Sequence, residues 1–342
     1  MTEKPFLVVG GPEISAEIEA DRPGCLEVIR AGYLAHENQQ SVLPHSSFLR
    51  FPHRESDRII ALPGYLGADF DVAGIKWIAS FPGNTANGIP RASAALLLND
   101  CTTGYPFACL EASVISASRT AASAVLGAEA LTGQRKANTI GFIGTGLIAE
   151  NIRRFFRDLN WQLGEFLLYD HSADAAGRFA ADCTADGAGE VRIADSAEQV
   201  CAESDLVVLA TVAGTPHIHD PELLRHNPVV LHVSLRDLAP ELILGAFNIT
   251  DDVDHAVRER TSLHLTEQRT GNREFVHGTI AELVTGRIER PAGQPAIFSP
   301  FGLGVLDLAL GSWVHRKITE RGGGTVVENF FPGQHGFPGA PA

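Results

Sequence analysis

The feature that most constrains this chain is a glycine-rich turn between an apolar strand and a helix. A short apolar run at 138–143 leads into Gly144 and Gly146, and helical spacing then continues over 147–159. Counted from Gly144, the turn reads G-x-G-x-x-A and ends at Ala149. Gly144 allows the tight turn, Gly146 lets the backbone approach a pyrophosphate, and Ala149 lets the helix pack closely on the sheet. The pattern predicts a dinucleotide site, and the alternative is a purely structural turn.

Strand and helix signals alternate after this turn. The run 205–210 is almost continuously apolar, which is typical of a parallel strand covered on both faces. We therefore predict an α/β fold, a Rossmann doubly wound parallel sheet. Its further strands are expected at 165–169, 190–193, 228–233 and 246–250, with helices at 173–183 and 196–203.

Asp170 closes the second strand of this sheet, 26 residues beyond Gly144. A carboxylate at this position accepts hydrogen bonds from the adenosine ribose hydroxyls and repels a 2′-phosphate. The next residue is His171 rather than an arginine. The sequence therefore favours NAD over NADP, although Asp170 could instead cap a turn.

Charge and cysteine content exclude several classes of protein. The 41 acidic residues outnumber 27 basic ones, a net charge of −14 that argues against sequence-blind nucleic-acid binding. The five cysteines form no C-x-x-C pair, which argues against a zinc cage or a disulfide framework and favours free thiols. No secretory signal and no run of about 18 apolar residues is present. We expect a cytoplasmic protein with no bound metal and no membrane partner.

Four cations stand in otherwise uncharged surroundings. Lys76 lies in an apolar stretch at 72–81, and Arg119 is the one charge in an Ala, Ser and Val helix at 112–125. A buried ammonium is costly without a partner, so Lys76 either reaches solvent or meets an anion. Arg50 and Arg91 are weaker cases that could form ordinary ion pairs. Because a guanidinium suits carboxylates, the set suggests a small polyanionic substrate.

Several segments resemble the ornithine cyclodeaminase/mu-crystallin family. They are the glycine turn, Lys76-Trp-Ile-Ala-Ser-Phe-Pro-Gly-Asn84 and Ile115-Ser-Ala-Ser-Arg-Thr-Ala-Ala-Ser-Ala124. Other segments resemble a narrower branch that serves 2,3-diaminopropionate biosynthesis, namely Phe81-Pro-Gly-Asn-Thr85, Ile89-Pro-Arg-Ala-Ser-Ala94, Leu98-Asn-Asp100, Thr103-Gly-Tyr-Pro106, Ala108-Cys-Leu-Glu111 and Ser234-Leu-Arg-Asp-Leu-Ala-Pro-Glu241.

The resemblance implies an activity as well as a fold. Members of this branch are NAD-dependent dehydrogenases that cleave N-(2-amino-2-carboxyethyl)-L-glutamate to 2-oxoglutarate and 2,3-diaminopropionate, for siderophore and peptide natural products. It also implies a homodimer. Residues 1–125 and 305–342 would form an α+β substrate-binding and dimerisation domain around a Rossmann domain at 126–304.

The resemblance also assigns residues to roles. Arg50, Lys76 and Arg119, with Arg91 as a further candidate, would grip substrate carboxylates. Asp237, together with Lys76, would be catalytic, although Asp237 could instead be a solvated loop acid or a partner of Arg236. The dinucleotide would contact Gly144, Thr145, Gly146, Leu147, Ile148, Asp170, His171, Thr211, Ser234, Leu235 and Leu303.

Two departures bear on the alternatives. Cyclodeaminases of the family look to carry a glutamate before the Pro of their first sheet, where this chain has Ile59-Ile-Ala-Leu-Pro63. They also have a basic residue after the catalytic Asp, where this chain has Ala239-Pro-Glu241. Both changes favour the dehydrogenase over a lyase that uses NAD transiently. A non-catalytic binding protein, like the crystallins, is the third possibility.

The sequence also gives expectations for four histidines and for the C-terminal residues. His217 and His219 could ligate a metal but fit a polar loop lining better, and no G-x-S-x-G elbow supports a hydrolase. We expect His232 and His264 to be satisfied core histidines. An apolar helix is expected at about 301–320, and the Gly- and Pro-rich tail from Gly322 to Ala342 is expected to be poorly ordered or draped on a surface.

Overall fold

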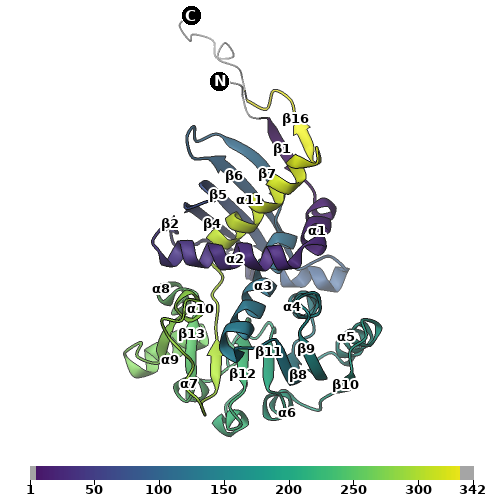
Figure 1. Cartoon of the computed structure of the whole chain (residues 1–342), viewed down its shortest axis with the longest axis vertical. Coiled ribbons are helices and arrows are strands. Elements are labelled where there is room, and N and C mark those ends of the chain that lie inside the picture. The colour runs from purple at the N-terminus through teal and green to yellow at the C-terminus, as the bar shows by residue number, and fades with distance from the viewer. Residues whose placement is uncertain (1–4, 332–342) are drawn as a thin grey trace, which may run out of the picture. The chain divides into compact units, whose positions relative to one another are not determined.

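The computed structural model describes residues 5–331, and its internal contacts divide the chain into two units (Figure 1). Unit 1 comprises Met1–Asp21, Asn38–Ser116 and Gly304–Ala342, and unit 2 comprises Arg22–Glu37 and Ala117–Leu303. The segment 22–37, expected with the first domain, has its contacts in unit 2. It forms helix α2 (Arg22–Glu37), which packs against α4 and α10 through buried side chains such as Leu26 and Ile29.

Unit 1 is built on one sheet with strand order β16-β1-β7-β6-β5-β4-β2, and β3 pairs with β4. All its pairings are antiparallel except that of β1 with β7. Helix α11 packs against strands β4 to β7, and Figure 1 shows it in yellow along this sheet. The elements are β1 (Phe6–Val9), α1 (Gly11–Ala20), β2 (Ser41–Val42), β3 (Ser47–Phe51), β4 (Arg54–Leu66), β5 (Val72–Ser80), the 3-10 helix η1 (Pro82–Asn87), β6 (Ala92–Asp100), β7 (Pro106–Glu111), α11 (Gly304–Glu320) and β16 (Thr325–Val327).

The two faces of this sheet differ. Lys76 pairs with Leu62 and Leu96 in the register, so these side chains share one face. A Cβ at Gly74, on the same face, would lie 2.8 Å from Leu308 of α11, which identifies this as the covered face. Trp77, one residue on, points to the opposite face and is 46% exposed.

Unit 2 contains an all-parallel sheet with strand order β10-β9-β8-β11-β12-β15-β13-β14, as the α/β prediction requires. All four residues of β11 are buried, which confirms that this strand is covered on both faces. The elements besides α2 are α3 (Ser113–Thr132, which crosses the boundary between the units), β8 (Lys136–Ile143), α4 (Leu147–Asp158), β9 (Gln162–Tyr169), α5 (Ala173–Ala185), β10 (Glu190–Ile193), α6 (Ala197–Glu203), β11 (Leu206–Leu209), the 3-10 helix η2 (Pro221–Leu224), β12 (Val229–His232), α7 (Pro240–Leu244), β13 (Phe247–Thr250), α8 (Val253–Ala256), α9 (Ser262–Thr270), β14 (Val276–Thr279), α10 (Ile280–Val284) and β15 (Ala296–Phe298).

The sheet order places a switch point between β8 and β11. From β8 the chain adds β9 and β10 on one side, and then crosses to add β11 and β12 on the other. Ligands of open parallel sheets bind at the carboxyl ends of the strands beside such a point.

One expectation for the chain end is wrong in part. Thr325–Val327 form strand β16, which pairs antiparallel with β1, because extending the sheet satisfies the backbone groups of both strands. Residues 332–342 of the tail lie outside the described residues.

Candidate active site

The two glycines of the turn have different surroundings. Gly144 adopts a φ of +84°, and a Cβ there would lie 2.6 Å from the Ala210 carbonyl oxygen. Gly146 has extended backbone, and a Cβ there would meet no atom within 4 Å. Gly144 is therefore required by the fold, whereas the space beside Gly146 is open to a ligand. Helix α4 begins at Leu147 with Gly146 as its N-cap, so its first N–H groups are available to an anion.

Asp170 is tied to this same turn. One of its carboxylate oxygens, Oδ2, accepts hydrogen bonds from the Thr145 backbone N–H at 2.8 Å and from the Thr145 hydroxyl at 3.0 Å. The other, Oδ1, accepts the Ser172 N–H at 2.9 Å. Burial alone would raise the pKa of Asp170, but these hydrogen bonds outweigh it and lower the pKa, so the carboxylate is ionised at neutral pH. Asp170 thus caps a turn, and its role toward a ribose remains a prediction.

Apolar side chains flank the turn in solvent. Leu147 is 68% exposed and Val212, which follows Thr211 after β11, is 81% exposed. Large apolar side chains at the mouth of a parallel sheet give flat surfaces for the rings of a ligand. Ile148 is half-buried and His171 is exposed, its Nδ1 lying 3.4 Å from the Tyr169 hydroxyl.

Asp237 lies at the centre of a polar cluster beyond the carboxyl ends of β11 and β12. Its side chain is fully buried, and Oδ1 accepts from the Thr211 hydroxyl and from His217 Nε2 at 3.0 Å. The other oxygen, Oδ2, accepts from the Ser234 hydroxyl. Burial by itself would raise the pKa of Asp237, but the hydrogen bonds from His217 and Ser234 lower it strongly. Asp237 is therefore an ionised carboxylate held among donors.

Of the two alternative roles for Asp237, the solvated loop acid is wrong, and the partnership with Arg236 is met only by electrostatic attraction. It is not a solvated loop acid, because its side chain has no exposure. It is not the hydrogen-bonded partner of Arg236, whose guanidinium donates to the Glu259 carbonyl at 2.7 Å. The loop also carries strain, since Leu235 adopts a φ of +71°, which a branched side chain rarely takes.

His232 is a satisfied core histidine, as predicted. It is fully buried, its Nε2 accepts the Asp237 backbone N–H at 3.1 Å, and its Nδ1 lies 3.2 Å from the Ser299 hydroxyl. Because a backbone N–H can only donate, the ring proton lies on Nδ1. His264 is half-buried, and its Nδ1 accepts the Arg260 N–H at 3.1 Å.

Arg119 lies against a loop that is anchored by a buried carboxylate. Gly302 adopts a φ of +96°, which residues with a side chain rarely take, and a Cβ there would lie 2.5 Å from Arg119 Nη1. Asp251 accepts the N–H groups of Phe301 and Gly302 at 2.8 and 2.7 Å. Burial raises the pKa of Asp251. The adjacent Leu303 is 1% exposed.

Lys76 is buried and meets an anion of the chain itself. Its Nζ donates to Asp307 of α11 at 2.6 Å and to the Ser116 hydroxyl at 3.2 Å, and it is 2% exposed. The solvated alternative for Lys76 is therefore wrong. The two weaker candidates are exposed: Arg50 lies over the Phe48 ring at 5.3 Å, and Arg91 donates to the Ser80 hydroxyl at 3.2 Å.

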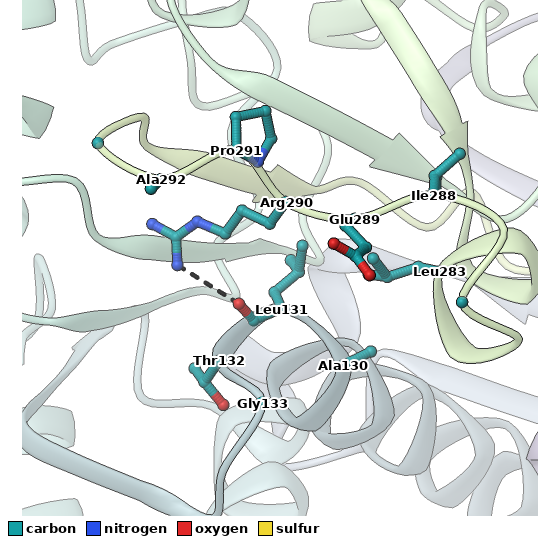
Figure 2. A pocket seen from close by; sticks show the side chains of 12 residues that line it. Ala130, Leu131, Thr132, Gly133, Leu283, Ile288, Glu289, Arg290, Pro291 and Ala292 are labelled. Atoms are coloured by element: carbon teal, nitrogen blue, oxygen red, sulfur yellow. Dashed lines mark hydrogen bonds between the residues drawn. The ribbon is translucent and has the colours of Figure 1, made fainter.

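A separate pocket in unit 2 lies away from this site (Figure 2). It is lined by the end of α3 and the loop 288–293, which precede the amino ends of β8 and β15. Arg290 bridges these segments, donating to Leu131 at 3.4 Å and to Asn227 at 2.7 Å. Because it lies at the opposite edge of the parallel sheet from Gly144, the pocket does not belong to the dinucleotide site.

Three functional candidates escaped the sequence analysis. The sequence predicted His217 to be a polar loop lining rather than a metal ligand, but not a partner of Asp237, and it did not point to Asp251 or Asp307. Their signals exist but are weak: Asp251 ends a strand, and Asp307 is one acid in an apolar helix. Across residues 5–331, no group of three His, Cys, Asp or Glu could hold a metal ion. Over the same residues, no helix is both long and apolar enough to cross a membrane.

Comparisons with known proteins agree with this architecture. The sequence model of the ornithine cyclodeaminase/mu-crystallin family matches residues 25–322. N-((2S)-2-amino-2-carboxyethyl)-L-glutamate dehydrogenase of Staphylococcus aureus is 26% identical, over 88% of this chain and 92% of that protein. Alanine dehydrogenase of Archaeoglobus fulgidus is 25% identical, over 95% of this chain and 98% of that protein.

Among solved structures, the fold is shared with Δ1-pyrroline-2-carboxylate reductase of Thermococcus litoralis, a structure that contains NADH and L-proline. The TM-score is 0.85 at 23% identity, covering 94% of this chain and 100% of that chain.

Proposed function

Because this chain belongs to the ornithine cyclodeaminase/mu-crystallin family, we propose that it is an NAD-dependent oxidoreductase acting on a C–N bond of an amino acid. Curated relatives are named as dehydrogenases and reductases of amino acids and imines. The observation that carries the proposal is the open backbone at Gly146, on the same sheet edge as Asp170 and the Asp237 cluster.

The residues of this edge fit a dinucleotide. The first turn of α4 would bind the pyrophosphate, and Asp170 would accept the ribose hydroxyls. Thr211, Ser234 and Leu235 follow β11 and β12, next to the switch point, where the nicotinamide half would lie. When bound, the nicotinamide supplies the hydride chemistry.

For the substrate, we propose N-(2-amino-2-carboxyethyl)-L-glutamate, the amine named in the Staphylococcus aureus relative. This amine joins two amino acids through one nitrogen and carries several carboxylates, which suits a chain with candidate cations at Arg50, Arg91 and Arg119. Lys76, the fourth candidate, is paired with Asp307 and would bind the substrate only by exchanging this carboxylate for one of the substrate's. The apolar stretch at 59–62 supports this amine over ornithine, whose side-chain ammonium needs a carboxylate partner.

The chain's own residues would orient the substrate and manage protons. Arg119, in the same unit as the glycine turn, would hold a carboxylate so that the glutamate α-carbon is correctly placed. The Asp237 cluster would take up the proton during hydrolysis of the imine product. The overall reaction consumes the amine, water and NAD⁺, and releases 2-oxoglutarate, 2,3-diaminopropionate, NADH and a proton.

We also propose a homodimer in the cytoplasm. The open face of the unit 1 sheet presents Trp77 and Leu49, which are 46% and 47% exposed and suit a second copy of the chain. All five cysteines are free, which suits a reducing compartment.

Incubation with NAD⁺ and candidate amines tests the activity. Net accumulation of NADH with N-(2-amino-2-carboxyethyl)-L-glutamate is the expected result. Formation of proline and ammonia from ornithine without net NADH would establish the lyase instead. Tight NAD binding with turnover of no amine would identify a binding protein.

A further inference from the structure

His217 is the partly exposed histidine of the Asp237 cluster. Its side chain is 32% exposed, whereas those of Asp237 and His232 have no exposure. Asp237 accepts from Thr211 and His217 on one oxygen and from Ser234 on the other. A carboxylate enclosed in this way has no open path to a substrate. Thr211 and Ser234 are also partly exposed, but their hydroxyls do not store a proton near neutral pH, whereas an imidazole does. His217 is therefore the member of the cluster suited to take up and return a proton.

The backbone fixes His217 relative to Asp237. The N–H groups of His217 and Ile218 both donate to the Asp237 carbonyl, at 2.9 and 3.0 Å, and the Ala239 N–H donates to Ile218 at 2.9 Å. Ile218 and Leu238 thereby form an isolated parallel bridge. His217 is held at its backbone N–H and at its ring Nε2 atom, and these two contacts set the orientation of the imidazole ring.

We propose that His217 is the residue that exchanges the proton with the reacting molecule, and that Asp237 is its positioning residue. This inference rests on the proposed function and deepens it. Nε2–H donates to Asp237, which leaves the Nδ1 lone pair as the ring's proton acceptor.

The proton step balances without a further reactant. The water oxygen bonds to the imine carbon while its O–H bond breaks, and the proton moves to His217 Nδ1. The π electron pair of the imine moves to nitrogen, which takes the proton back from His217 to give a carbinolamine. The carbinolamine O–H bond then breaks toward His217 Nδ1 and its electron pair forms the C=O bond. The C–N bond breaks at the same time, and the leaving amine nitrogen takes this second proton from His217. Asp237 stabilises the imidazolium between these transfers, in the way that a buried carboxylate supports a catalytic histidine.

The charges around His217 favour its protonated form. The facing acids are Asp237, on the loop after β12, and Glu198, on α6. The hydrogen bond to Asp237 is the main cause that raises the pKa of His217, against the opposing effect of burial. Since the acceptor must be unprotonated, turnover should be low below this raised pKa and increase as the pH passes through it.

The first experiment compares His217→Asn with His219→Asn, an exposed histidine two residues along the same loop. We expect His217→Asn to lower kcat by about 10²–10⁴-fold, the usual contribution of a proton-transfer group, with unchanged affinity for NADH. His219→Asn should keep wild-type kcat. If His217→Asn keeps kcat within about threefold, well short of that contribution, the inference is overturned.

The second experiment follows the histidine ring signals by NMR across a pH titration, without substrate. We expect His217 to titrate above the ordinary value of about 6.5, and Asp237→Asn to move its titration to lower pH. A His217 titration unaltered by Asp237→Asn would show that the pair does not act together.

The two experiments separate the two proposals. If no amine is oxidised, the proposed function fails, and the titration still decides whether Asp237 controls His217. If Asp237→Asn does not fold, the pH profile of kcat decides: an acid limb in the wild type that is absent from the residual activity of His217→Asn supports the inference. An acid limb that persists in His217→Asn overturns it.

Discussion

At the scale of single residues, the two glycines of the turn give a matched pair of tests. Gly146→Ser adds a Cβ where no atom lies within 4 Å, and serine is a good N-cap. We expect the free energy of unfolding to change by less than about 0.5 kcal/mol. The affinity for NADH should fall at least about tenfold, because the Cβ enters the space for the pyrophosphate. Calorimetric titration and thermal unfolding measure the two effects.

Gly144→Ser is the counterpart. The same side chain at a φ of +84°, against the Ala210 carbonyl, should lower the free energy of unfolding by about 1–3 kcal/mol. Equal effects of the two variants on folding and on NADH affinity would contradict the distinction between a structural and a ligand-facing glycine.

Arg119 supplies a second residue-level prediction. Arg119→Ala should raise KM about ten- to a hundredfold, or abolish turnover, because a charge-assisted contact with a carboxylate is lost. The affinity for NADH should stay at the wild-type value, and the exposed Arg225→Ala serves as the control. Unaltered KM and kcat in Arg119→Ala would exclude the carboxylate role.

The role of a single residue could be predicted from the sequence only where a local motif defines that role. Gly144 and Gly146 belong to a local motif, so their roles follow from spacing along the chain. Asp237 could be singled out, and its partners His232 and Ser234 lie close to it in the sequence. Thr211 and His217 come from the segment after β11, 26 and 20 residues away. Contacts across strands leave no local pattern, which is why His217 was missed as a partner.

At the scale of elements, the contact of β5 with α11 predicts a large stability effect. Asp307→Leu leaves the buried Lys76 ammonium without this carboxylate, and the free energy of unfolding should fall by about 3–5 kcal/mol. Adding Lys76→Met should recover most of the loss, because two apolar side chains replace the ion pair. Urea denaturation measures both variants.

The control is the half-exposed pair of Lys317 with Asp21, whose side chains are 30% and 39% exposed. Lys317→Met should cost less than about 1 kcal/mol, as is usual for surface ion pairs. If Asp307→Leu lowers the free energy of unfolding no more than Lys317→Met does, the buried ion pair contributes no more to stability than the half-exposed one.

The strands of unit 2 up to β13, with the helices α4, α5 and α6, could be predicted from the sequence, because each apolar run ends at a turn signal. The helices α2 and α7 were not predicted. The strands β14 (Val276–Thr279) and β15 (Ala296–Phe298) could not be predicted. They are short, and β15 enters the sheet between β12 and β13, a place that depends on tertiary pairing rather than on local pattern. For the same reason β16 was expected to be part of a loose tail.

At the scale of the whole molecule, the open face of the unit 1 sheet predicts self-association. Trp77→Glu should raise the dissociation constant of the proposed dimer by about 30-fold or more, as for a buried aromatic at the centre of an interface. Leu244→Glu, at a 45% exposed site on α7, is the control and should stay dimeric. Sedimentation velocity measures the assembly, and a dimeric Trp77→Glu would exclude this face.

The division of the chain into units was the least predictable level. The segment 22–37 lies in the sequence between β1 and β2 of the unit 1 sheet, yet its apolar side, with Cys25, Leu26 and Ile29, is buried in unit 2. Amphipathic spacing predicts that a helix needs a partner, but it does not say which one.

The hydrogen bonds between Thr145 and Asp170 have a consequence for redesign. Replacing Asp170 with a neutral or basic side chain, to relax the proposed preference for NAD, would remove two hydrogen bonds that anchor the loop proposed to bind the pyrophosphate. A variant made to accept NADP would therefore bind both NAD and NADP more weakly, unless a second substitution restored a hydrogen-bond acceptor for Thr145. In the proposed site, a single carboxylate would couple coenzyme selectivity to coenzyme affinity.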